Sequence, residues 1–179
     1  PSGYYAPTAQ VDACLECSAG DHTSVASKAT TCASCNGGTY SEGLAVNCSV
    51  CAAGTASSSR ASECIDCDAG KYSTTAAATC SSCAGGTFST AGSRNCSACG
   101  GGTYSNTGSA SCTACDSGTY SEAESSACTK CDSGTWSGTI ATSCTDCVAG
   151  RSSGSGASAC IACDGGYYSD KASSACTKC

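Results

Sequence analysis

Aromatic side chains occur at regular intervals along this chain, and small or polar residues fill the stretches between them. From Cys32 onward the phrase Cys-x-x-Cys-x-x-Gly-x-aromatic-Ser returns every sixteen residues with few departures, as in CTACDSGTYSEAESSACTKCDSGTWSG at 112–138. Apolar residues never recur at helical spacing, so no helix is predicted. Thr and aromatic residues favour extended structure, and the Ser, Ala, Thr and Gly that follow are typical of loops. Each repeat is therefore predicted to form one short strand or hairpin and a loop.

A glycine stands three residues after the second cysteine of each pair, where a left-handed or tightly turned backbone would exclude a side chain. These glycines are Gly20, Gly38, Gly54, Gly70, Gly86, Gly102, Gly118, Gly134, Gly150 and Gly166, and Gly3 takes the same place in the first repeat.

Two residues after the glycine comes a position that we call the aromatic slot. In eight repeats it holds an aromatic residue: Tyr5, Tyr40, Tyr72, Phe88, Tyr104, Tyr120, Trp136 and Tyr168. His22, Ala56 and Ser152 occupy the other three slots, and a serine follows the slot in nine repeats. We expect the rings to form a ladder that serves as a small core, each covering its neighbour's backbone or disulfide, rather than a surface that binds sugars.

The whole chain is predicted to be one continuous array of eleven repeats, each ending on the second cysteine of a pair. The repeats are 1–17, 18–35, 36–51, 52–67, 68–83, 84–99, 100–115, 116–131, 132–147, 148–163 and 164–179. In such arrays each repeat is expected to contact only its neighbours. The predicted fold class is small, disulfide-rich and mainly β and loop, an elongated rod with no conventional hydrophobic core and essentially no helix. Both ends fall at the same phase of the repeat, so we expect a segment excerpted from a longer array or joined head to tail into one.

Composition makes sulfur the expected source of stability. Ten residues are Val, Ile or Leu, and Phe88 and Trp136 are the only members of their types. A chain with so few large apolar groups cannot offset the entropy of ordering its backbone. The 22 cysteines change that conclusion, because such a density marks a disulfide scaffold made in an oxidising compartment. We therefore expect a secreted, extracellular or cell-surface protein.

Charge and hydropathy exclude two classes of partner. The net charge is −6, and the eight Lys and Arg residues stand singly, which does not suit nucleic-acid binding. The chain has no apolar run of the roughly 20 residues that a membrane helix needs, so no membrane insertion is expected in this segment. It starts at Pro1 without a leader sequence, and we expect a mature or excerpted segment.

Sequence alone does not fix the disulfide pairing. The scheme we favour links the second cysteine of one pair to the first of the next, and it leaves Cys14 and Cys179 to bond neighbouring copies or further chain. Its bonds are Cys17–Cys32, Cys35–Cys48, Cys51–Cys64, Cys67–Cys80, Cys83–Cys96, Cys99–Cys112, Cys115–Cys128, Cys131–Cys144, Cys147–Cys160 and Cys163–Cys176. The alternative joins first to first and second to second cysteines, and it leaves one whole pair without a partner.

Other chemistry fits the residues less well. Paired Cys-x-x-Cys motifs are a zinc signal, but eleven pairs cannot be divided into sets of four thiolates, so neither metal nor cofactor is predicted. His22 is the only histidine, and we interpret it as a surface residue in an aromatic slot. The neighbouring carboxylates Glu122 and Glu124, or Asp66 and Asp68, have no apolar setting to shift their pKa. We expect no enzymatic activity.

Glycosylation is the candidate modification. Asn47 and Asn95 begin Asn-Cys-Ser acceptor sequences, and the Ser/Thr-rich loops are candidate sites for O-linked sugars.

At CNGGTYSEG, CDSGTYSEA and CDGGYYSDK the chain resembles the ephrin-receptor-like cysteine-rich tandem repeat, whose mark is Cys-x-x-Cys-Pro-x-Gly-x-Tyr-Ser. Similar repeats occur in protist cysteine-rich surface proteins and in flagellar-hair (mastigoneme-type) filament proteins. Only Pro1 keeps the proline of the motif; Ser18, Asn36, Ala52 and Asp68 are among its replacements. The resemblance implies a rod of small disulfide-bonded modules.

From these features we predict an extracellular structural protein that forms a rod or filament, with itself as its partner and with covalent glycans. The alternative is a monomeric cysteine-rich ectodomain or stalk of a surface antigen or receptor.

Overall fold

The computed structural model describes residues 4–6, 15–23 and 30–179. The chain divides into two compact units, one made of residues 1–82 and 89–96 and the other of 83–88 and 97–179.

Both units consist of two-residue strands paired as antiparallel hairpins, and the described residues contain no helix. The first strand of a hairpin ends on the aromatic slot, and the second strand is the dipeptide between two cysteines of a pair. In the first unit the strands are β1 (Tyr4–Tyr5), β2 (Leu15–Glu16), β3 (Asp21–His22), β4 (Ala33–Ser34), β5 (Thr39–Tyr40), β6 (Ser49–Val50), β7 (Thr55–Ala56), β8 (Ile65–Asp66), β9 (Lys71–Tyr72) and β10 (Ser81–Ser82).

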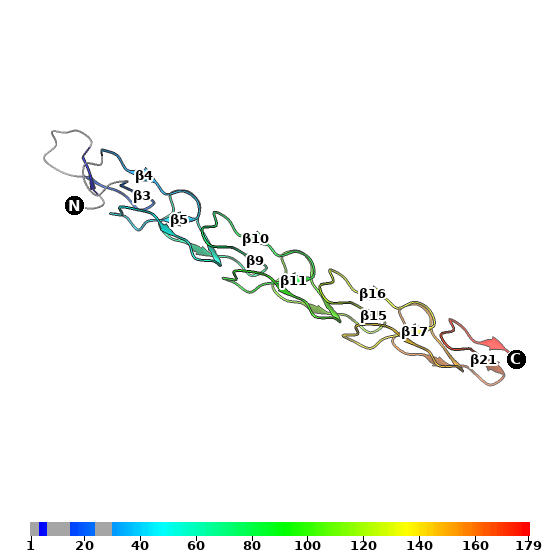
Figure 1. Cartoon of the computed structure of the whole chain (residues 1–179). Helices are drawn as coiled ribbons and strands as arrows, with labels where there is room; N and C mark the ends of the chain where they lie inside the picture. The colour runs from blue at the N-terminus through cyan, green and yellow to red at the C-terminus, as the bar shows by residue number, and fades with distance from the viewer. Residues whose placement is uncertain (1–3, 7–14, 24–29) are drawn as a thin grey trace. The chain divides into compact units, whose positions relative to one another are not determined.

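The second unit repeats this arrangement in six further hairpins. Its strands are β11 (Thr87–Phe88), β12 (Ser97–Ala98), β13 (Thr103–Tyr104), β14 (Thr113–Ala114), β15 (Thr119–Tyr120), β16 (Thr129–Lys130), β17 (Thr135–Trp136), β18 (Thr145–Asp146), β19 (Arg151–Ser152), β20 (Ile161–Ala162), β21 (Tyr167–Tyr168) and β22 (Thr177–Lys178). Consecutive strands pair in one register, for example Thr119 with Lys130 and Tyr120 with Thr129 in β15 and β16 (Figure 1). The predicted class of short strands and loops without helix is therefore confirmed for the described residues.

A tight turn before each first strand explains the recurring glycine. In the third repeat the Thr39 amide donates to the Asn36 carbonyl at 3.1 Å, and Gly38 has a φ of +85°. This is the geometry of a turn that needs a left-handed residue at its third position. The Thr39 hydroxyl donates to the same carbonyl at 2.8 Å, which fixes the turn further. The predicted left-handed glycine is confirmed from Gly20 to Gly166, and Gly3 lies outside the described residues.

Each repeat is hydrogen-bonded to the next one. The turn glycine donates its amide to the carbonyl of the serine after the next aromatic slot, as Gly118 does to Ser137 at 2.8 Å. In return the serine hydroxyl donates to the carbonyl two residues before the preceding slot serine, as Ser137 does to Thr119 at 2.9 Å. Backbone polar groups are thus paired between repeats, where no regular sheet pairs them.

Each repeat also contacts the repeat after the next, which corrects the prediction that only neighbours touch. The contact is made by a residue with φ between +52° and +74°, which we call the corner residue. Corner residues are Leu44, Arg60, Ala76, Gly92, Gly108, Glu124, Ile140, Gly156 and Ala172. Their amides donate to the carbonyl of a second cysteine two repeats earlier, as Ile140 does to Cys115 at 2.9 Å. Their carbonyl oxygens lie so close to a turn glycine that a Cβ there would overlap them, as at Gly102 and Ile140.

The buried interior consists of sulfur and serine, not of aromatic rings. The second cysteines from Cys17 to Cys147 are at most 2% exposed, and the slot serines from Ser41 to Ser169 are at most 6% exposed. The rings of Tyr40, Tyr72 and Trp136 are half-buried, and Tyr168 is 50% exposed. The expectation that the aromatic ladder forms the core is therefore wrong for the described residues, where the slot rings are half-buried or exposed.

Among the described residues, no helix has the length and apolar character required to span a bilayer.

Candidate functional site

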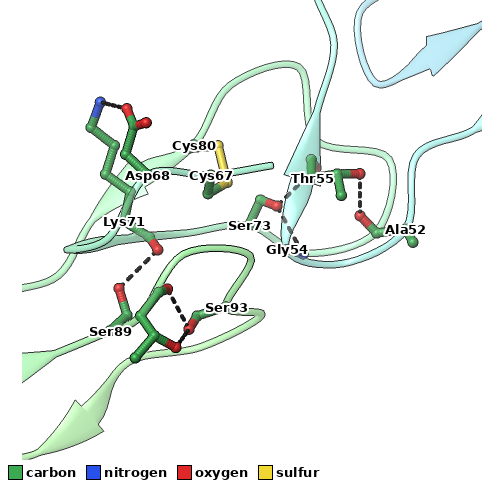
Figure 2. The surroundings of a disulfide bond; sticks show 11 residues. Ala52, Gly54, Thr55, Cys67, Asp68, Lys71, Ser73, Cys80, Ser89 and Ser93 are labelled. Atoms are coloured by element: carbon green, nitrogen blue, oxygen red, sulfur yellow. Dashed lines mark hydrogen bonds and ion pairs between the residues drawn. A yellow bond between two sulfur atoms is a disulfide. The ribbon is translucent and has the colours of Figure 1, made fainter. Parts of the chain in front are cut away.

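The disulfides are the main chemical feature of the structure, and they join consecutive repeats. Nine bonds between described cysteines have Cα–Cα distances of 5.7–5.8 Å. They are Cys17–Cys32, Cys35–Cys48, Cys51–Cys64, Cys67–Cys80, Cys99–Cys112, Cys115–Cys128, Cys131–Cys144, Cys147–Cys160 and Cys163–Cys176. All nine follow the sequential scheme, and Figure 2 shows the bond between Cys67 and Cys80.

The remaining cysteines differ from one another. Cys83 and Cys96 are disulfide-bonded as well. Cys179 is exposed and has a free thiol. Cys14, for which we predicted a bond to another copy or to further chain, lies outside the described residues.

The two ends of each disulfide lie in different environments. In the Cys67–Cys80 bond, Cys67 is 1% exposed whereas Cys80 is only half-buried. Next to the inner cysteine, Ser73 donates its hydroxyl to the Thr55 carbonyl at 2.8 Å and accepts the Gly54 amide at 3.1 Å (Figure 2). The serine after the slot recurs in nine repeats, but the sequence predicted no role for it. This recurrence is the feature of the sequence that indicates the hydrogen-bond network.

The aromatic slot faces the outer sulfur of the following disulfide. A shallow groove of about 350 Å³ is lined by Tyr104 together with Cys128, and one of about 370 Å³ by Trp136 together with Cys160. Where serine replaces the aromatic residue, the Ser152 hydroxyl lies 3.4 Å from the Cys176 sulfur. In these repeats the slot residue therefore lies beside the outer cysteine of the following disulfide, 24 positions later in the chain.

His22 occupies such a slot, in the repeat whose loop is two residues longer. Its Nδ1 lies 3.1 Å from the sulfur of Cys48, which is bonded to Cys35. His22 and Cys48 are half-buried and Cys35 is buried, and the three potential ligand atoms lie within 4.8 Å of one another. A disulfide offers no thiolate, so this trio is not a metal site while the bond is intact. His22 lies in the predicted aromatic slot, but it is half-buried beside a disulfide and is not the surface residue that we expected.

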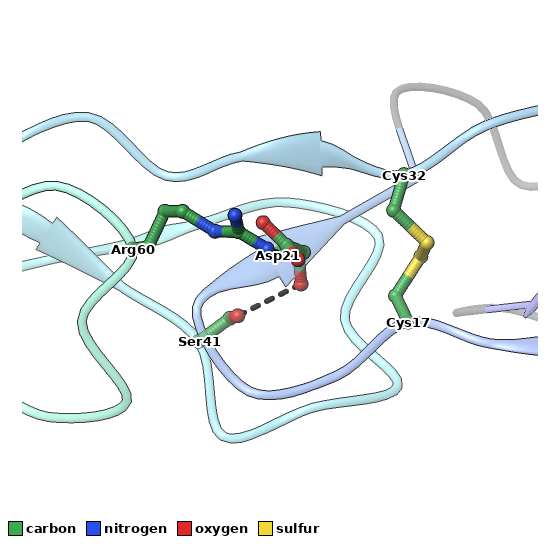
Figure 3. Close-up of polar contacts among 5 residues, drawn as sticks. All are labelled: Cys17, Asp21, Cys32, Ser41 and Arg60. Atoms are coloured by element: carbon green, nitrogen blue, oxygen red, sulfur yellow. Dashed lines mark hydrogen bonds and ion pairs between the residues drawn. A yellow bond between two sulfur atoms is a disulfide. The ribbon is translucent and has the colours of Figure 1, made fainter.

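Two ion pairs of the described residues link repeats that are two apart, one between Lys171 and Asp146 at 3.0 Å and one between Arg60 and Asp21. The Arg60 guanidinium donates to the Asp21 carboxylate at 2.8 Å, and the Asp21 side chain is 12% exposed whereas that of Arg60 is 66% exposed. The hydrogen bond from Arg60 is the main cause that lowers the pKa of Asp21. Ser41 donates to the Asp21 backbone carbonyl at 2.8 Å, so the same residue is fixed by repeats three and four (Figure 3).

The other candidate residues are on the surface. Asn47 and Asn95 are exposed, as a glycan acceptor must be, although Cys48 between Asn47 and Ser49 is closed into a disulfide. Glu122, Glu124, Asp66 and Asp68 are also exposed, and Asp68 pairs with Lys71 at 3.4 Å.

The comparisons with known proteins agree with this architecture. The search among curated proteins gave no match. Residues 102–147, which belong to repeats seven to nine, match the family described as tyrosine-protein kinase ephrin type A/B receptor-like. Disulfide-rich repeats of this kind are typical of extracellular domains. Over these repeats the chain is therefore similar to the ephrin-receptor-like cysteine-rich family, and the same disulfide-linked Cys-x-x-Cys repeat recurs in the other described repeats.

Proposed function

We propose that this chain is an extracellular structural protein whose repeats build a disulfide-stapled rod or filament. The observation that supports the proposal most strongly is the recurrence of one contact set within each compact unit. A repeat is disulfide-bonded and hydrogen-bonded to the next repeat, and its turn glycine lies against the corner residue of the repeat after that. A protein built this way extends by addition of equivalent modules, and its stability comes from cross-links and backbone hydrogen bonds rather than a large apolar core.

The proposal assigns the chain to the outside of the cell, with no enzymatic activity and no cofactor. It names a further copy of the chain as the partner, in head-to-tail or lateral contact. Glycans on Asn47, Asn95 and the Ser/Thr loops would cover the polar surface; both asparagines are exposed.

A second candidate is a monomeric stalk or ectodomain of a surface antigen or receptor. It is supported by the similarity of residues 102–147 to a family named for ephrin-type receptors. Stalk and filament share the same module, and self-association distinguishes them.

Sedimentation velocity and electron microscopy of the secreted, oxidised chain over a concentration series test the proposal. A filament gives species larger than the monomer, with a helical or linear repeat in the images. The variant Cys179→Ser separates assembly through the free thiol from non-covalent assembly. A protein that stays monomeric at every concentration contradicts the filament and favours the stalk.

A further inference from the structure

The single histidine of the chain occupies an aromatic slot. In other repeats the residue in this slot lies beside the outer cysteine of a disulfide. Tyr104 and Trp136 line grooves with the outer cysteine of the next repeat, and their side chains cannot serve as metal ligands of the ordinary kind. His22 holds the equivalent place beside Cys48, with an imidazole nitrogen 3.1 Å from the sulfur. The repeat thus differs from the others in chemistry while it keeps the same geometry.

We propose that opening of the Cys35–Cys48 disulfide creates a three-ligand site for a Zn²⁺-type cation, made of His22 Nδ1 and the two cysteine sulfurs. In the closed bond the three ligand atoms already lie within 4.8 Å of one another. Tetrahedral zinc needs bonds of about 2.3 Å to sulfur and 2.0–2.1 Å to nitrogen, so its ligand atoms stand roughly 3.5–3.8 Å apart. Side-chain rotations of modest size reach that arrangement.

The backbone around the site is fixed by hydrogen bonds that do not depend on this disulfide. The Cys35 amide donates to the Gly20 carbonyl at 2.9 Å, and the Thr23 amide donates to the Ala45 carbonyl at 2.9 Å. His22 itself is paired with Ala33 in the hairpin and forms a parallel bridge to Ala45. The three ligands are therefore held near one another after the S–S bond opens, as a metal site requires.

Opening of the Cys35–Cys48 disulfide is a two-electron reduction, and a dithiol can serve as the reductant. The dithiol transfers two electrons and two protons, the Cys35–Cys48 bond breaks into two thiols, and the dithiol leaves as its own disulfide. Binding of the cation then releases one proton from each thiol, while neutral His22 donates its Nδ1 lone pair. Two thiolates neutralise the divalent charge, which suits a site where Cys35 is buried, and water fills the fourth position on the exposed side.

Cation binding would keep this one pair reduced. A ligand that binds only the open form shifts the equilibrium toward it by mass action. The shift is smaller where a tyrosine or tryptophan fills the slot, because the opened pair then offers two thiolates without the imidazole. The proposal is independent of whether the chain forms filaments.

Zinc-dependent protection of cysteines tests the site in the full chain. The oxidised protein is treated with a limiting dithiol so that most disulfides stay intact, either with Zn²⁺ or with a chelator. The reductant is removed, air reoxidises the open pairs, a chelator is added to both samples, and free thiols are alkylated and mapped by mass spectrometry. We expect labelling of Cys35 and Cys48 to be about tenfold higher in the zinc sample, whereas Cys51 and Cys64 are labelled equally in both.

Two variants give matched controls. His22→Tyr restores the usual slot residue and should abolish the zinc-dependent labelling of Cys35 and Cys48. Tyr104→His moves the imidazole to a slot that faces Cys128, and should confer the same protection on Cys115 and Cys128. Equal zinc protection at every cysteine pair, or protection unchanged in His22→Tyr, overturns the proposal. Absence of protection in the unmodified chain overturns it as well.

Discussion

At the scale of the residue, this fold depends on two backbone positions with positive φ. The turn glycine was recognisable from its strict recurrence. The corner residue was not, because only Gly92, Gly108 and Gly156 among the nine corner residues are glycine. Its conformation is imposed by hydrogen bonding to a repeat that lies two repeats away in the sequence, which no local pattern reveals.

Replacement of a turn glycine should destabilise the protein. Gly118 has a φ of +82°, and a Cβ at this position would overlap the Gly156 carbonyl oxygen. We expect Gly118→Ala to lower the free energy of unfolding by about 2 kcal/mol or more, measured by guanidinium denaturation of the oxidised protein. Gly100→Ala is the control, because nothing lies within 4 Å of a Cβ there. Equal effects of the two substitutions would contradict the role of the close approach.

Replacement of a strained corner residue by glycine should have the opposite effect and stabilise the protein. Ala76 has a φ of 62°, a conformation that costs an alanine about 1 kcal/mol and a glycine nearly nothing. Ala76→Gly is expected to raise the free energy of unfolding by roughly 0.5–1 kcal/mol in the same assay. Ala98→Gly, in the exposed strand β12, should lower it, and a loss of stability in both variants would count against left-handed strain at Ala76.

The ion pair of Asp21 predicts a pH dependence. Its pKa is lowered in the folded state by the hydrogen bond from Arg60, so the stabilisation is present above the ordinary value of 3.8 and is lost as the pH falls through the folded value. Arg60→Gln should raise the pKa of Asp21, followed by NMR titration of its carboxyl carbon, and shift acid unfolding to higher pH. Unfolding curves that superimpose over this range would refute the coupling.

At the scale of the element, the hairpins are too short to be stable by themselves. Each has two residues per strand, and the second strands are exposed throughout. Short strands, loops and turns could be predicted, because Thr, aromatic residues and Gly mark them locally. The burial of the slot serine could not be predicted. A buried hydroxyl needs a hydrogen-bond partner, and here that partner lies 18 residues earlier in the chain.

Loss of one buried hydroxyl tests this interior. Ser73→Ala removes the donor of a part-buried hydrogen bond to the Thr55 carbonyl, whereas the Gly54 amide keeps the Ser73 backbone carbonyl as its acceptor at 2.9 Å. We expect a loss of about 1–2 kcal/mol in the free energy of unfolding. Ser81→Ala, on the exposed strand β10, should leave the free energy of unfolding unchanged.

At the candidate site, too, some features could be predicted from the sequence, and others depend on contacts between residues far apart in the chain. The nine sequential disulfides agree with the scheme favoured from the sequence, in which each bond joins cysteines of two neighbouring pairs. The contact between His22 and Cys48 joins residues 26 positions apart, and it follows from the stacking of one repeat on the next. We expected slot residues to cover a neighbouring backbone or disulfide, but spacing alone could not identify which cysteine each slot residue meets.

At the scale of the whole molecule, the disulfide loops follow one another without overlap, so the described chain from Cys17 to Cys176 is unbridged only at the dipeptide inside each Cys-x-x-Cys. Arg60, Lys71 and Arg151 lie inside closed loops, whereas Lys130 lies between Cys128 and Cys131. We predict that trypsin separates the unreduced chain after Lys130, with a second cut after Lys178 that frees only Cys179. A further separation after Arg94 would contradict the predicted Cys83–Cys96 bond. Mass spectrometry before and after reduction distinguishes these outcomes.

The gaps between loops also limit how far the chain can be pulled. With its bonds intact, the covalent path through a repeat crosses three Cα steps and one disulfide with a Cα–Cα distance of 5.7 Å, about 17 Å in all. After reduction the same sixteen residues reach roughly 55 Å. Under load this protein would thus behave as a nearly inextensible tether, and a reducing agent would lengthen it about threefold at constant mass.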